Sequence, residues 1–212
     1  MQNPVWDPDG HALFRRNDAT GWQSFDPWQL SWSPCATPPE AARAVSASGA
    51  LRLLAENRRL RRVPIAVIGP REATPRQAEM AEALGREMAL HGLQLLCGGK
   101  SGVMEAAGRG HLRAGGLPIG LIPDEEWQAA NDFIAIPLAT GIGPARNAII
   151  ARAGLVLVAI GGGVGTISEM ALGIQFGRLV LALEDAPEVP HCRRLSSVDE
   201  VLDAIAERIL DL

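Results

Sequence analysis

Short apolar runs alternate with segments of helical periodicity through the chain from Val63 onward. The near-continuous apolar runs predict buried strands, at Val63–Gly69, Leu93–Cys97, Leu117–Pro123, Phe133–Leu138, Gly154–Ile160 and Arg178–Leu183. Helical spacing of apolar residues predicts helices between them, at Thr74–His91, Gly102–Ala114, Pro144–Ala153, Thr166–Phe176 and Ser197–Leu210. Apolar strands that alternate with helices predict an α/β fold with a doubly wound parallel sheet and helices on both of its faces.

The first 60 residues follow a different pattern. Their tryptophans stand among proline, aspartate, asparagine and glycine, which is typical of short strands and turns: Trp6, Trp22, Trp28 and Trp32. The alanine-rich stretch Pro39–Asn57 predicts a helix. The basic run Arg58–Arg62 is interpreted as a solvated hinge, with an anion-binding patch as the alternative. We therefore expect a small Trp-rich N-terminal extension, residues 1–60, and a ligand-binding domain, residues 61–212.

Composition and charge exclude several classes of function. The chain has 212 residues and a formal net charge of -4, so it offers no bulk attraction to nucleic acid or to anionic lipid. It contains neither a signal peptide nor an apolar run long enough to span a membrane. Cys35, Cys97 and Cys192 are widely spaced and match no metal or disulfide pattern. These features predict a soluble cytoplasmic protein without a metal site.

Two glycine-rich turns each follow a predicted strand and precede a predicted helix. The first contains Gly98, Gly99, Lys100 and Ser101, and the second contains Gly161, Gly162, Gly163, Val164, Gly165 and Thr166. Ligands of open parallel sheets bind beyond the carboxyl ends of the strands, and glycine lets backbone N–H groups approach an anion at a helix N-terminus. Both turns therefore suit phosphate, although tight packing of strand on helix is an alternative reason for the first. Lys100, the single lysine of the chain, could reach that phosphate.

The common nucleotide-binding fingerprints are absent from these turns. Gly99-Lys100-Ser101 resembles the end of a P-loop, but Gln94 stands where the first glycine of that motif is required. The second turn has Thr166 where a dinucleotide fingerprint needs its third glycine. The sequence therefore supports neither a P-loop ATPase nor a standard dehydrogenase.

Two charged side chains near the turns are candidates for chemistry. Arg146 begins the helix predicted after Pro144, where its guanidinium could face an anion or could simply be exposed. Glu169 follows Thr166 by three residues, so its carboxylate could lie at the mouth of the phosphate site. The alternative is a Thr166-x-x-Glu169 capping box, in which the carboxylate only accepts a backbone N–H.

Together these pieces resemble the Lonely Guy type of phosphoribohydrolase, formerly mislabelled as lysine decarboxylases. The wider superfamily also includes molybdenum-cofactor carrier proteins. The resemblance covers about residues 63–212 and rests on three segments: Gly98-Gly99-x-x-Gly102-Val103-Met104, Pro118–Pro123 and Gly162-Gly163-Val164-Gly165-Thr166-Ile167-Ser168-Glu169. It implies a Rossmann-like fold and places the catalytic arginine and glutamate of the hydrolases at Arg146 and Glu169.

The chain departs from the hydrolases at two positions. They usually have proline where this chain has Gly161, and lysine where it has Asn147. Both departures are closer to the branch that contains the cofactor carriers and uncharacterised nucleotide-binding proteins. The resemblance implies ligand contacts at the turns and next to them: Gly69, Gly98, Gly99, Lys100, Ser101, Met104, Asn147, Gly162, Gly163, Val164, Gly165 and Thr166.

The first functional hypothesis is hydrolysis of the N-glycosidic bond of a nucleoside 5'-monophosphate, giving a base and ribose 5-phosphate. Glu169 would stabilise the oxocarbenium-like sugar and position water, Arg146 would orient the substrate, and no cofactor would be required. The alternative is a non-catalytic carrier that binds molybdenum cofactor or another phosphorylated ligand at the same turns. The resemblance also implies a homodimer or a larger homo-oligomer.

Overall fold

The computed structural model describes residues 3–57 and 60–212. Contacts between residues divide the chain into two compact units, one formed by residues 1–62 with 202–212 and the other by residues 63–201. The sequence pattern predicts that the whole last helix belongs to the second domain. In the structure the boundary falls inside that helix, α6 (Val198–Leu210). The expected hinge at 58–62 falls partly on residues 58 and 59, which lie outside the described residues.

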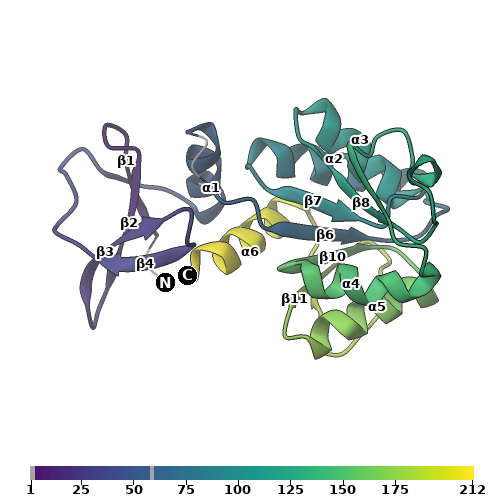
Figure 1. Ribbon diagram of the computed structural model, residues 1–212. Helices are drawn as coiled ribbons and strands as arrows, with labels where there is room; N and C mark the ends of the chain where they lie inside the picture. The colour runs from purple at the N-terminus through teal and green to yellow at the C-terminus, as the bar shows by residue number, and fades with distance from the viewer. Residues whose placement is uncertain (1–2, 58–59) are drawn as a thin grey trace. The chain divides into compact units, whose positions relative to one another are not determined.

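The first unit contains a five-stranded antiparallel sheet in the order β4-β3-β2-β1-β5 (Figure 1). Its strands are short, as the tryptophan-rich pattern predicts: β1 (Val5–Asp7), β2 (Ala12–Asn17), β3 (Gly21–Asp26), β4 (Ser31–Pro34) and β5 (Arg43–Ala44). Trp6 is buried, and the rings of Phe25 and Trp32 pack with their centroids 4.9 Å apart. These aromatic side chains supply much of the apolar interior of a sheet that is otherwise rich in turns.

The helix predicted over Pro39–Asn57 is wrong in its first half. Only α1 (Ala47–Glu56) forms, and it begins after Ser46, whose hydroxyl accepts a hydrogen bond from the Gly49 N–H. Upstream, Arg43 and Ala44 form β5 and pair with β1. Strand pairing over a long sequence separation therefore overrides the helical propensity of the alanines there.

The second unit contains a seven-stranded sheet in which every neighbouring pair of strands is parallel. The strands are β6 (Pro64–Ile68), β7 (Gln94–Cys97), β8 (Ile119–Ile122), β9 (Ile136–Ala139), β10 (Val156–Ile160), β11 (Leu179–Leu183) and β12 (Arg193–Arg194). Their order is β12-β11-β10-β6-β7-β8-β9, so the chain winds outward from β6 and then returns to place β10 beside it. The predicted doubly wound α/β fold is confirmed, with β12 as a strand that the sequence pattern did not indicate.

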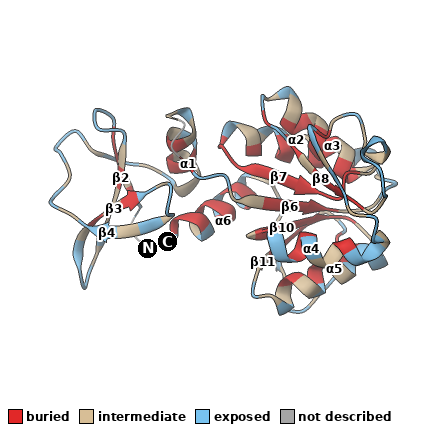
Figure 2. Ribbon diagram, in the orientation of Figure 1, coloured by how far each residue is buried: buried red, intermediate tan, exposed pale blue. Residues whose placement is uncertain are grey.

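Helices cover both faces of this sheet. Figure 1 shows α2 (Pro75–Leu90) and α3 (Val103–Arg113) on one face and α4 (Arg146–Ala153) and α5 (Val164–Gln175) on the other. The central strands are buried almost throughout, as Figure 2 shows, because both of their faces are covered. Short 3-10 helices, η1 (Trp127–Ala129) and η2 (Gly143–Ala145), lie in the connections. The helix expected from Pro144 thus begins as η2 and becomes α-helical at Arg146.

Candidate functional site

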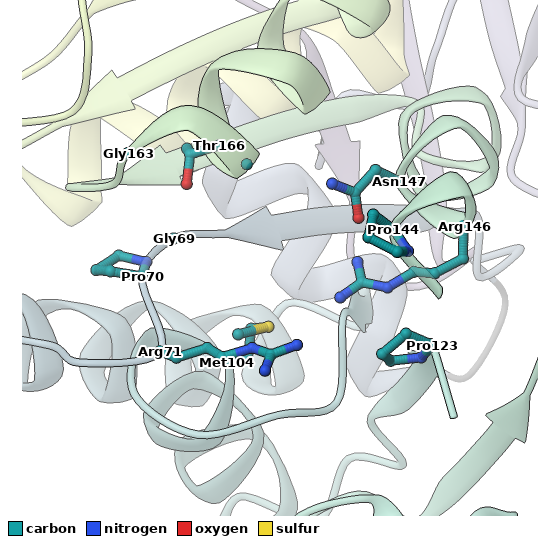
Figure 3. Close-up of a pocket in the computed structure, with 11 residues that line it drawn as sticks. Gly69, Pro70, Arg71, Met104, Pro123, Pro144, Arg146, Asn147, Gly163 and Thr166 are labelled. Carbon is teal, nitrogen blue, oxygen red and sulfur yellow. The ribbon is translucent and has the colours of Figure 1, made fainter. Parts of the chain in front are cut away.

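A cavity of about 340 Å³ lies at the carboxyl ends of β6 and β10, the neighbouring strands at which the winding of the sheet reverses (Figure 3). Open α/β sheets bind their ligands at such a switch point. Segments that follow β6, β8 and β10 form its walls together with the starts of α3, α4 and α5. The lining residues are Gly69, Pro70, Arg71, Met104, Pro123, Pro144, Arg146, Asn147, Gly163, Gly165 and Thr166.

The glycine turn after β10 leaves the N-terminus of α5 open to a ligand. Gly161 and Gly162 have φ angles of 58° and 132°, which disfavour residues with a side chain. Gly163 is the N-cap, and within the described chain no side chain caps this helix; its first turn carries no acidic residue. The first backbone N–H groups of α5 therefore remain available to an anion, beside the positive end of the helix dipole.

Arg146 and Glu169 form a buried ion pair next to this turn. Arg146 is the first residue of α4 and donates from Nη1 to Oε1 of Glu169 on α5, at 3.2 Å. Each side chain is only 8% exposed. Asn147 donates to the Ser168 hydroxyl at 3.4 Å, which ties the same two helices together. The capping-box alternative is wrong, because Thr166 lies inside α5 and the Glu169 carboxylate pairs with Arg146.

Gly98 provides the space that the Arg146 guanidinium occupies. A Cβ at residue 98 would lie 2.8 Å from Cζ of Arg146 and still closer to Nη2. The glycine of the first turn thus shapes the site by admitting an arginine. Nε of Arg146 is buried and has no hydrogen-bond partner within the described part of the chain. A buried donor in this state is costly unless a ligand or water completes its hydrogen bonding.

Burial controls the electrostatics of the pair. It raises the pKa of Glu169 to about 7, and the charge and hydrogen bond of Arg146 oppose that rise. Burial also lowers the pKa of Arg146, against the attraction of Glu169. Beneath them, burial raises the pKa of the Cys97 thiol to about 11, so the thiol is neutral at physiological pH. A carboxyl group that changes charge near neutrality beside a permanent cation is typical of functional sites.

The rest of the first glycine turn packs against its surroundings. Lys100 Nζ donates to the Asp124 carboxylate at 2.9 Å and to the Ala129 carbonyl at 2.7 Å. Ser101 donates from its hydroxyl to the Arg71 carbonyl at 3.0 Å. Gly99 lies against β8, where an added Cβ would contact Ile122. In this structure Gly98, Gly99, Lys100 and Ser101 therefore support the cavity without lining it, and their contact with a ligand remains a prediction.

The structure brings together residues that are far apart in the sequence. Of the predicted site residues, catalytic and ligand-binding together, seven line the cavity: Gly69, Met104, Arg146, Asn147, Gly163, Gly165 and Thr166. Gly162 and Val164 lie in the same turn without lining the cavity, and Val164 is 86% exposed. Arg71 also lines the cavity, although it belongs to neither glycine motif and was not predicted as a site residue. The feature of the sequence that could have identified Arg71 is its position, two residues beyond the carboxyl end of the first predicted strand.

The described residues contain neither a metal-binding cluster nor a membrane-spanning helix. Within residues 3–57 and 60–212, no three histidine, cysteine, aspartate or glutamate side chains gather closely enough to hold a metal ion. No helix among the described residues combines the length and apolar character that a membrane span requires.

Known proteins are similar to this chain in sequence and fold over about two thirds of its length. A protein of Archaeoglobus fulgidus with no described function is 35% identical over 139 residues, which cover 66% of this chain and 91% of that protein. The molybdenum cofactor binding protein of Rippkaea orientalis is 34% identical with a TM-score of 0.66, over 70% of this chain and 98% of its own. The molybdenum cofactor carrier protein of Chlamydomonas reinhardtii is 33% identical with a TM-score of 0.64, over 72% and 100%.

These likenesses confirm the superfamily that the glycine motifs indicate. The family model that matches spans residues 62–206, which include the seven-stranded sheet and every residue that lines the cavity. The chain belongs to the SLOG cluster4 family.

Proposed function

We propose that the cavity binds a phosphorylated small molecule, with the phosphate at the N-terminus of α5. The observation that carries this proposal is the convergence of two anion-binding features on one cavity. The uncapped turn at Gly163–Gly165 supplies backbone N–H groups, and the buried Arg146 supplies a cation with an unpartnered donor. Phosphate oxygens would satisfy both.

Molybdenum cofactor is the ligand that we propose first, held without turnover as cargo. Two similar structures are named for binding or carrying this cofactor, at 34% and 33% identity. The cofactor combines a phosphate with a pterin ring system, which can make apolar contacts as well as hydrogen bonds. Pro70, Met104, Pro123 and Pro144 provide apolar surface in the same cavity as the phosphate turn.

Hydrolysis of a nucleoside 5'-monophosphate is the second candidate. The Arg146–Glu169 pair favours it, because a carboxylate near the sugar could stabilise an oxocarbenium-like transition state. We rank it second because Glu169 is not among the residues that line the cavity. Its carboxylate is buried and pairs with the Arg146 guanidinium at 3.2 Å.

Binding and turnover can be separated with one purified protein. For binding, the protein is mixed anaerobically with molybdenum cofactor released from a molybdoenzyme and passed through a gel-filtration column. The protein peak is then oxidised and assayed for the fluorescent pterin derivative. Co-elution with the wild type and its loss in Arg146→Ala would support the carrier proposal. A protein peak free of pterin would overturn it.

For turnover, the protein is incubated with AMP, GMP, CMP and UMP, and free base is measured by chromatography. The carrier proposal expects no base release. Base release that Glu169→Gln abolishes would establish the hydrolase in its place.

We also propose that the chain forms a homodimer or larger assembly. Four aliphatic residues within two positions of cavity-lining residues are exposed in the single chain: Ile142, Ile149, Val164 and Ile167. Sedimentation velocity at micromolar concentration tests this proposal, and a profile at the monomer mass would contradict it.

A further inference from the structure

Arg71 is a cavity residue that neither glycine motif includes. It lies in the loop between β6 and α2, and its side chain points into the cavity toward the Arg146 guanidinium (Figure 3). None of the ion pairs found in the described part of the chain includes it. Its charge is felt nearby, because it lowers the pKa of Asp124 in addition to the larger effect of Lys100.

The cavity lining is positively charged. Arg71 and Arg146 both line it, and no aspartate or glutamate does. Glu169 does not line the cavity, and when ionised it offsets the charge of Arg146, so the excess positive charge belongs to Arg71. The two guanidinium groups repel each other, since Arg71 contributes to the lowered pKa of Arg146. An anion between the two groups would replace that repulsion with two attractive contacts.

Arg71 and the glycine turn lie at different places on the cavity wall. Figure 3 shows Arg71 and Met104 on one side and Gly163 with Thr166 on the other. A single phosphate at the start of α5 therefore leaves the Arg71 guanidinium without a partner. Arginine is well suited to this second place, because its planar fork can hold two oxygens of one anionic group.

We propose that Arg71 is a ligand-binding residue which receives a second anionic group of the ligand, and that Arg146 contacts both this group and the phosphate at the α5 turn. The ligand class is thereby narrowed to molecules that carry a phosphate at one end and another anionic group, a phosphate, carboxylate or oxoanion, at the other. This inference rests on the proposed function in one respect, because it assumes that the first phosphate occupies the α5 turn.

The test compares ribose 1,5-bisphosphate with ribose 5-phosphate by isothermal titration calorimetry. We expect the wild type to bind the bisphosphate at least about tenfold more tightly than the monophosphate. Arg71→Gln should remove that preference while changing the affinity for the monophosphate less than about threefold. Arg71 is exposed on a loop, so the variant should fold, and its far-UV circular dichroism checks this.

Arg86→Gln is the matched control. This arginine has a side chain that is 61% exposed and lies on α2 outside the cavity, so its loss changes the net charge equally. The control should keep the preference for the bisphosphate. Three results would each overturn the inference. Arg71→Gln could weaken the affinity for both sugar phosphates equally, or it could leave the preference for the bisphosphate unchanged. The third is that the wild type shows no detectable binding of the bisphosphate.

The same variants separate this inference from the proposed ligand. If the wild type fails to bind molybdenum cofactor but shows a bisphosphate preference that requires Arg71, the carrier proposal falls and the inference stands. If the cofactor binds and Arg71→Gln leaves both its retention and the bisphosphate preference unchanged, only the inference falls.

Discussion

The buried Glu169 carboxyl should make the stability of the sheet domain depend on pH, and replacing it with glutamine should remove that dependence. Its pKa is raised from 4.5 to about 7 by burial, against the opposing effect of Arg146. Between pH 4.5 and about 7, the folded state therefore keeps a proton on Glu169 that the unfolded chain has lost. The contribution to stability is complete below pH 4.5 and is lost progressively as the pH rises to about 7.

The size of this effect follows from the shift. Each unit of pKa difference corresponds to about 1.4 kcal/mol, so ionising Glu169 should lower the free energy of unfolding by about 3 kcal/mol. Glutamine has the shape of the protonated acid, and its Oε1 can still accept a hydrogen bond from Arg146. Glu169→Gln should therefore lie within about 1 kcal/mol of the wild type at pH 5 and exceed its stability by up to about 3 kcal/mol at pH 8.

Urea unfolding followed by far-UV circular dichroism at several pH values between 5 and 9 measures this difference. The signal suits the question, because α2, α3, α4 and α5 all belong to the unit of residues 63–201. Glu79→Gln, an exposed position on α2, controls for the loss of one carboxylate. A difference between wild type and Glu169→Gln that is constant with pH, or that grows in favour of the wild type, would refute the reasoning.

Three other perturbations test the site. Gly98→Ala should displace the Arg146 guanidinium and weaken binding of ribose 5-phosphate about tenfold, as measured by calorimetry. Gly108→Ala is the control, because an added Cβ there makes only ordinary contacts and should leave the affinity unchanged. Equal affinities of the two variants would contradict the packing argument. Cys97 should be the slowest thiol to react with iodoacetamide at pH 8 in the folded protein, because it is fully buried and its pKa is raised to about 11. Labelling of Cys97 before Cys35 and Cys192, detected by mass spectrometry, would count against this burial. Lys100→Met should lower the free energy of unfolding by about 1 kcal/mol, because the Lys100 ammonium donates to Asp124 and to the Ala129 carbonyl. The affinity for ribose 5-phosphate should stay within about threefold of the wild-type value. A large loss of affinity would instead indicate that Lys100 contacts the ligand.

The sequence by itself determined the fold of the second unit and the region of its site. Near-continuous apolar runs such as Val63–Gly69 and Gly154–Ile160 have few alternatives to buried parallel strands, because their pattern offers no polar face to water. Glycine clusters after strands mark close backbone approaches, and that local requirement is visible in the residues themselves. The superfamily followed from these motifs, and the comparisons confirm it.

Only the tertiary structure decided which partner each polar side chain takes. Glu169 has the local spacing of a capping box, yet its carboxylate pairs with Arg146 on another helix. Lys100 stands in a glycine turn, yet its ammonium donates a hydrogen bond to the Asp124 carboxylate. Arg71 has no motif and still lines the cavity.

The physical reason is one of range. Periodicity and turn chemistry depend on neighbours along the chain, whereas hydrogen bonds and ion pairs depend on which segments folding brings within about 3 Å of each other. β5 is the same case in the backbone, because its residues became a strand by pairing with β1. Local sequence thus determined the sheet and the place of the cavity, and contacts between distant segments determined its charge.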